Sequence, residues 1–292
     1  MKKYLSALWG IVFLLLLVNF AEHDAEKVEI TQTEKKGENE EIEEVEEIKP
    51  KRNGFYLGSD GYLEQIFSEQ DKQALLQVSS MEEEEIYSFL QGPKSWKEKI
   101  SWSGEWCKFG VEGNPFGGFG CGLCCLANIY DTLTPYEVSP WDMYEYAILV
   151  TDYRPSGKAG AIDWKPMKKV LNYCGFSCNI YRKSKTYEEF REEMAQMKSA
   201  IVLVSSNNDS TFWRDTPGHY VNIWMYQEED DTVFLAEPGN PENNRKRIPL
   251  RYVYDALKTK SKFQYLVVED YLEEQNQWKA DGIDERWNPP AK

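Results

Sequence analysis

FGCGLCCLANIY, residues 119–130, is the most informative stretch of the sequence for both fold and function. It places Cys121 between two glycines, where a glycine-rich run passes into an apolar helix expected over residues 122–130. The dipole and free amide groups of a helix start stabilise a thiolate, and the glycines at 117, 118, 120 and 122 are expected to leave room for a substrate. The stretch therefore predicts a thiol nucleophile. The competing interpretation is a tight loop that ends in a buried cysteine.

PGHYVNIWMY, residues 217–226, supplies the partner that such a thiol needs. The chain has two histidines, and His23 lies in a charged stretch near the N-terminus. His219, at the start of an expected strand, is therefore the candidate general base. Glu237 precedes a proline at the end of the next expected strand and is predicted to orient the imidazole, with Asn240 as the alternative. A structural histidine followed by ordinary turn residues is the competing interpretation.

Length, charge and cysteine count narrow the class of protein. The 292 residues suffice for one domain of ordinary to large size, or two small ones, with appendages. A net charge of -15 argues against nucleic acid as a partner, because a phosphate backbone needs a basic surface. Of the six cysteines, Cys174 and Cys178 are candidates for a bridge, whereas Cys124 and Cys125 are expected to pack within the helix. With a single histidine in the domain, no metal or organic cofactor is predicted.

The N-terminus predicts export. Two lysines precede an apolar run, and residues 1–21 are typical of a signal peptide or a signal anchor. No clear cleavage site follows, which favours an uncleaved anchor with the domain outside the cell. Residues 22–53 are rich in Glu and Lys and lack aromatic residues, so we expect an acidic, disordered tether. The predicted location is the cell membrane with an extracellular domain, or the secreted fraction.

Residues 54–292 have the pattern of a folded unit. Helical spacing over 62–78 and 81–92 predicts an N-terminal helical cap covering residues 54–100. Helices starting at Ser139 and Asp163, and further helices at 186–198 and 249–258, alternate with strands near 178–182, 200–206, 219–227, 232–238 and 263–269. This order predicts an α+β catalytic domain over 101–272, with the cysteine helix packed on a mostly antiparallel sheet. Residues 273–292 are expected to form a polar tail.

The ordered set of GCG before an apolar helix, GHYV on a strand and an acid–proline pair on the next strand resembles a known family. It is similar to the papain-fold cysteine peptidases related to bacteriocin-processing, double-glycine-leader enzymes. The resemblance implies a papain-like fold, with Cys121 as nucleophile, His219 as base and Glu237 as the third member. That family places an oxyanion glutamine a few residues before the cysteine. Here Asn114 is the nearest amide upstream.

The predicted function is hydrolysis of a peptide or amide bond in a peptide or protein substrate by a membrane-anchored cysteine peptidase. Two other functions fit the same residues. One is a non-catalytic module that binds peptides or cell-wall fragments, and the other is an acyl transferase that forms the same thioester. The sequence leaves the oligomeric state open.

Overall fold

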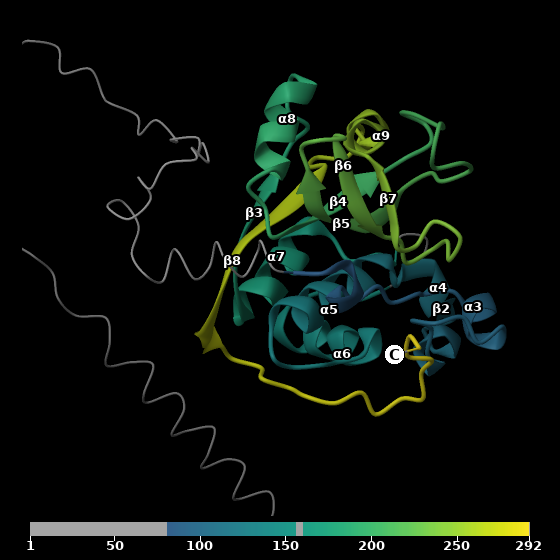
Figure 1. Ribbon diagram of the computed structural model, residues 1–292. Coiled ribbons are helices and arrows are strands. Elements are labelled where there is room, and N and C mark those ends of the chain that lie inside the picture. Colours follow the sequence, from purple (N-terminus) through teal and green to yellow (C-terminus); the bar gives the residue numbers. More distant parts are fainter. Residues whose placement is uncertain (1–80, 156–159, 292) are drawn as a thin grey trace, which may run out of the picture. The chain divides into compact units, whose positions relative to one another are not determined.

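Apolar runs in the second half of the chain form a six-stranded sheet (Figure 1). The computed structural model describes residues 81–155 and 160–291. Within them the sheet has the order β3-β8-β4-β5-β6-β7, and each neighbouring pair is antiparallel. The strands are β3 (Cys174–Tyr181), β4 (Ser199–Val204), β5 (His219–Gln227), β6 (Thr232–Ala236), β7 (Lys246–Pro249) and β8 (Tyr265–Asn276).

Helices precede the sheet and are inserted between its strands. The α-helices are α3 (Pro93–Lys97), α4 (Phe116–Phe119), α5 (Cys121–Leu133), α6 (Pro140–Val150), α7 (Trp164–Tyr173), α8 (Tyr187–Met194) and α9 (Leu250–Ala256). Two 3-10 turns, η2 (Glu83–Glu85) and η3 (Glu105–Lys108), and a small hairpin, β1 (Gly110–Val111) and β2 (Asn114–Pro115), complete the described elements. The predicted α+β class with an antiparallel sheet is confirmed.

The sheet buries both of its faces. Along β5, Tyr220 and Trp224 belong to a core that includes α5, α6 and α7, whereas Val221 and Ile223 belong to a second core that includes α8 and α9. Figure 1 shows α5 and α6 on one side of the sheet and α9 on the other. Because side chains alternate along a strand, both parities of β5 must be apolar. The sequence of β5 meets this requirement.

Two predicted helix starts are confirmed. The Ser139 side chain accepts hydrogen bonds from the amides of Trp141 and Asp142, so Ser139 is the N-cap of α6. The Asp163 carboxylate accepts from the Trp164 amide at the start of α7. These caps satisfy amide groups that a helix start otherwise leaves without partners.

The predicted helix over 81–92 is wrong. Only η2 is helical there, and the chain then runs extended to Gln91. The amides of this segment find distant partners instead: Phe89 N–H donates to Asn128 Oδ1 at 2.8 Å, and Leu90 N–H donates to the Trp102 carbonyl at 2.8 Å. Its apolar side chains are buried in the α5 core, and these tertiary contacts override the helical spacing.

The C-terminal residues do not form the expected polar tail. Strand β8 continues to Asn276, so the predicted boundary at 272 falls inside it. Residues 277–291 then lie along the domain as a strap (Figure 1). Its Trp287 ring packs against Phe89 and Trp102 with centroids 5.8 and 6.0 Å away, and Asn288 exchanges backbone hydrogen bonds with residues 102 and 103.

Several predictions about the first 80 residues lie outside the described residues, among them the signal segment 1–21, the tether 22–53 and the helix 62–78. Across residues 81–155 and 160–291, no helix has the length and apolarity needed to span a bilayer. All six cysteines lie in the described ranges and are free. The bridge suggested between Cys174 and Cys178 is therefore absent; both belong to the same strand, β3.

Candidate functional site

Cys121 is the first residue of α5, and its surroundings explain the glycines beside it. A Cβ on Gly122 would lie 2.6 Å from Ile162 Cγ2, and one on Gly120 would lie 2.4 Å from the Phe116 ring. These glycines therefore make room for side chains of the protein itself, which corrects the expectation that they make room for substrate. Cys121 is 7% exposed, more than any of the other five cysteines.

His219 and Glu237 meet at the ends of neighbouring strands. His219 is the first residue of β5, and Glu237 directly follows β6. The Nε2 atom of His219 is hydrogen-bonded to Glu237 Oε1. Nδ1 is thus the ring nitrogen left for the Cys121 thiol, with which the imidazole also interacts. The three residues predicted from the sequence are brought together in the order thiol, imidazole, carboxylate.

The Glu237 carboxylate is held by more than the imidazole. It is 1% exposed, and its Oε2 accepts a hydrogen bond from Trp213 Nε1 at 2.8 Å. Its Oε1 also accepts from the Gly239 amide at 3.0 Å. Hydrogen bonds to the charged form favour ionisation, so these donors offset part of the cost of burying a carboxylate. From the sequence, Trp213 is a candidate for lining a substrate groove, and its bond to the carboxylate was not predicted.

Burial and the contacts among Cys121, His219 and Glu237 have opposite effects on the pKa values of these three groups. For Cys121, burial opposes ionisation, but the hydrogen bond and charge of His219 outweigh it and lower the thiol pKa. For His219, burial disfavours the cation, but the Glu237 charge and the bonds to Cys121 and Glu237 raise the imidazole pKa well above its usual range. The pKa of Glu237 is lowered despite its burial, chiefly by His219. The arrangement favours a thiolate–imidazolium pair.

The other five thiols have the opposite character. Burial raises the pKa of Cys107 to about 11 and that of Cys178 to about 12. Burial also raises the pKa of Cys174, Cys124 and Cys125. Cys121 is therefore the one thiol of the chain whose surroundings lower its pKa.

The two amide candidates take other places. Asn240 Oδ1 accepts from the amide of Glu242, so its side chain closes a turn, and Glu237 holds the imidazole instead. Asn114 lies in the β1–β2 hairpin, where it pairs with Val111. Within the described residues, no hydrogen bond links Asn114 to Cys121.

Gln91 connects the segment before Cys121 with the residue after Glu237. Its Nε2 donates to the Gly117 carbonyl at 2.9 Å, four residues before Cys121. Its backbone amide donates to the Pro238 carbonyl at 2.9 Å, next to Glu237. The side chain is buried, its Oε1 has no partner among the described residues, and Nε2 keeps a second hydrogen to donate. The sequence analysis missed Gln91 because it lies 30 residues before Cys121, in a predicted helix.

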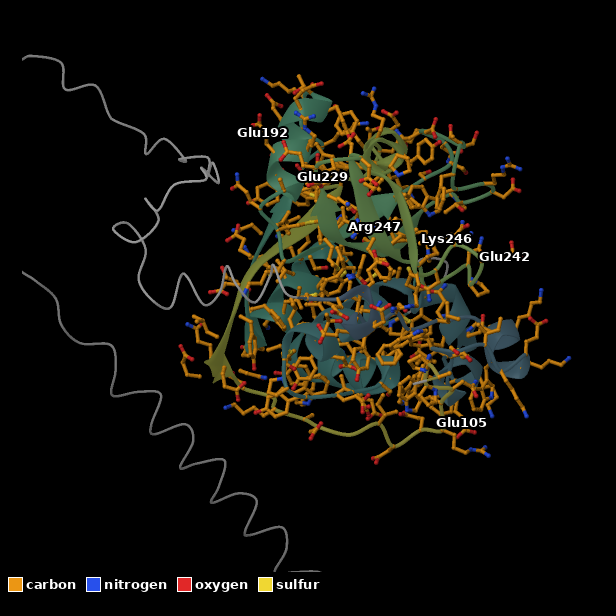
Figure 2. The ribbon with its side chains drawn as sticks, in the orientation of Figure 1. Glu105, Glu192, Glu229, Glu242, Lys246 and Arg247 are labelled. Carbon is orange, nitrogen blue, oxygen red and sulfur yellow. The ribbon has the colours of Figure 1, made fainter. Side chains whose placement is uncertain are left out.

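Basic residues after Glu237 anchor the segment that carries Gln91. Figure 2 shows Glu242 on the connection that follows Glu237, and Lys246 and Arg247 on β7. Arg247 pairs with Glu83 at 2.6 Å. Arg245 donates to the carbonyls of Glu83 and Ile86. The segment that leads to Gln91 is thus fixed to the part of the chain that follows Glu237.

The same ranges, 81–155 and 160–291, contain no group of three or more His, Cys, Asp or Glu residues arranged to hold a metal ion. No family model matches the chain, and no curated protein sequence is significantly similar to it. Among solved structures, one match is described as "Crystal structure of an putative C39-like peptidase from Bacillus anthracis". It is 13% identical, covers 52% of this chain and 90% of its own, and has a TM-score of 0.33. We draw nothing about fold or activity from a likeness of this degree.

Replacing Gly239 tests the packing of the imidazole. A Cβ at this position would lie 2.9 Å from both Cε1 and Nε2 of His219. Gly239→Ala should displace the ring and slow iodoacetamide alkylation of Cys121 at a pH of about 6 by about 10- to 100-fold. Gly118→Ala is the control, because its Cβ meets only Pro115 Cγ at 3.9 Å. Equal rates for the two variants would contradict this geometry.

Proposed function

We propose that the chain is a cysteine peptidase of papain-like fold that cleaves a peptide or amide bond through Cys121, His219 and Glu237. The observation that carries the proposal is the hydrogen bond between His219 Nε2 and Glu237, which leaves the other ring nitrogen for the thiol. A thiol nucleophile needs a base in contact with it and a third group that fixes the base. Each of the three has that relation to its neighbour.

The proposed reaction begins with attack of the Cys121 thiolate on the substrate carbonyl carbon. The Cys121 amide, at a helix start without an intrahelical partner, and the second Nε2 hydrogen of Gln91 hold the developing oxyanion. The His219 imidazolium then gives its proton to the leaving amine, and a thioester remains on Cys121. Next, His219 takes a proton from water, which attacks the thioester and releases the acid. Glu237 keeps the ring oriented and stabilises its positive charge throughout.

The Cys121–His219 pair predicts selective labelling. Iodoacetamide at a pH of about 6 should alkylate Cys121 ahead of the five thiols whose pKa burial raises. In His219→Ala, the main effects that oppose burial at Cys121 are removed, so its pKa rises and labelling at this pH should fall by about 10-fold or more. The measurement is peptide mapping of the full chain in detergent. Labelling without preference for Cys121 would reject the pair and favour a binding module.

Product analysis with the same preparation distinguishes the enzymatic alternatives. Wild-type protein incubated with a mixture of peptides should generate new N-termini, and Cys121→Ala should generate none. If added glycinamide captures most of the acyl groups as amides, the protein is an acyl transferase.

Gln91→Ala provides a separate test of the oxyanion site. Removal of one such donor typically lowers turnover by about 100- to 1000-fold. Labelling of Cys121 by iodoacetamide should continue, because this alkylation forms no oxyanion. Asn114→Ala is the matched control and should keep full turnover. Equal losses in the two variants, or none in Gln91→Ala, would remove Gln91 from the mechanism.

We further propose that the enzyme is exported and remains attached to the membrane through residues 1–21, with 22–53 as its tether. The support is the apolar run after Lys2 and Lys3 without a clear cleavage site. The protein should fractionate with membranes, and protease added to intact cells should release a fragment containing Cys121. Recovery from the soluble cytoplasmic fraction would contradict export.

A further inference from the structure

The proposed mechanism leaves a second thiol of the active-site helix unused. Helix α5 begins CGLCC, so Cys121 is followed at the third position by Cys124 and at the fourth by Cys125. Residues three apart lie on the same side of a helix, with Cβ atoms about 5–6 Å apart. Cys121 and Cys124 thus form a C-x-x-C pair whose first member starts the helix.

The two thiols differ in the ways that a redox pair requires. Cys121 is the more exposed, at 7%, and His219 favours its thiolate, the form that reacts with peroxides. Cys124 is fully buried, and its pKa is raised by burial and by the nearby Cys107 and Cys121. An oxidant therefore meets Cys121 first, while Cys124 remains a protonated thiol behind it.

We propose that Cys124 is a resolving thiol, which converts peroxide-oxidised Cys121 into a reversible Cys121–Cys124 disulfide. This rests on the thiolate–imidazolium pair of the proposed function, and it does not require hydrolysis of any substrate. Formation of the bond blocks the nucleophile until a thiol reductant restores it. The site thereby avoids irreversible oxidation of Cys121 to the sulfinic acid.

The reaction balances with hydrogen peroxide as the oxidant. The Cys121 thiolate attacks one peroxide oxygen, the O–O bond breaks, and the leaving hydroxide takes the proton of His219 to form water. Sulfur is oxidised by two electrons to the sulfenic acid, and the peroxide is reduced. The Cys124 sulfur then attacks the Cys121 sulfur. The S–O bond breaks, and the departing hydroxide takes the Cys124 proton as a second water.

The helix geometry allows this bond at small cost. A disulfide needs Cβ atoms about 3.5–4.5 Å apart, so Cys121 must move about 1–2 Å towards Cys124. Cys121 is the first residue of α5, and a residue there has no intrahelical bond at its amide to break. Cys125 lies one residue further along the axis, a rise of about 6.0 Å from Cys121 against about 4.5 Å for Cys124.

Mass spectrometry of the full chain in detergent tests the proposal without a substrate. After a small molar excess of hydrogen peroxide, enough to add two oxygen atoms to one sulfur, wild-type protein should lose about 2 Da, and dithiothreitol should reverse the loss. Cys124→Ala should instead gain about 32 Da as the sulfinic acid, which dithiothreitol does not reverse. Cys125→Ala is the matched control and should behave as wild type. Circular dichroism checks that both variants are folded.

The tryptic map decides between the possible partners. Lys108 is the only Lys or Arg between Ile100 and Arg154, so Cys107 falls in one peptide and Cys121, Cys124 and Cys125 fall in the next. The predicted disulfide is internal to the second peptide. Fragmentation between Cys124 and Cys125 should leave both bonded cysteines on the N-terminal fragment, whereas a bond to Cys125 would hold the two fragments together. This readout in wild-type protein holds even if Cys124→Ala does not fold.

Three results would overturn the proposal. They are a gain of about 32 Da in wild-type protein, a cross-link to the Cys107 peptide, and a bond to Cys125. In each of them, selective alkylation of Cys121 by iodoacetamide would still support the proposed peptidase. If Cys121 reacts with neither reagent, the thiolate–imidazolium pair is absent and both proposals fail.

Discussion

The docking of α5 on β5 through two buried asparagines determines where the reactive groups meet. Asn128 Nδ2 donates to Asn222 Oδ1 at 3.0 Å, and Asn222 Nδ2 donates to the Cys125 carbonyl at 3.3 Å. Both side chains are fully buried, so each unmade bond would carry a desolvation cost of about 1–3 kcal/mol. Cys121 lies two helical turns before Asn128, and His219 lies three residues before Asn222. The Asn128–Asn222 pair thus places the start of α5 next to the start of β5.

The same pair also brings in the segment that carries Gln91. Asn128 Oδ1 accepts from the amide of Phe89, two residues before Gln91. Arg245 and Arg247 hold the start of this segment from the side of β7, while Pro238 accepts from Gln91 itself. Three parts of the chain far apart in sequence are therefore fixed to one another, as the proposed reaction requires of the groups that take part in it.

Three ionisable side chains buried at one site would be costly if any stood alone. Breaking a buried ion pair by removing one partner typically costs about 3–5 kcal/mol, because an uncompensated charge remains. Here Cys121, His219 and Glu237 compensate one another, and Trp213 and the Gly239 amide satisfy the outer carboxylate. The site is consequently a cooperative unit in which the charge of each group depends on its neighbours.

Site residues that belong to local sequence patterns could be predicted from the sequence alone. Glycines around Cys121, a single domain histidine at a strand start and an acid before proline pointed to the three groups that the structure brings together. The apolar runs of the second half pointed to the sheet. Gln91 was missed because only tertiary hydrogen bonds distinguish its extended segment from a helix of the same apolar spacing. Asn240 was a reasonable alternative to Glu237, and only the turn geometry, in which it accepts from Glu242, separates them.

The charge state of His219 is the most direct test, and the presence of only two histidines makes it measurable. In full-length protein labelled with nitrogen-15 at histidine, ring NMR shifts as a function of pH report each imidazole separately. The imidazole of His219 should stay doubly protonated at a pH well above 6.5, the ordinary pKa of histidine, because Glu237 and Cys121 raise its pKa. A His219 ring that loses its proton at the ordinary histidine pKa would contradict the thiolate–imidazolium pair.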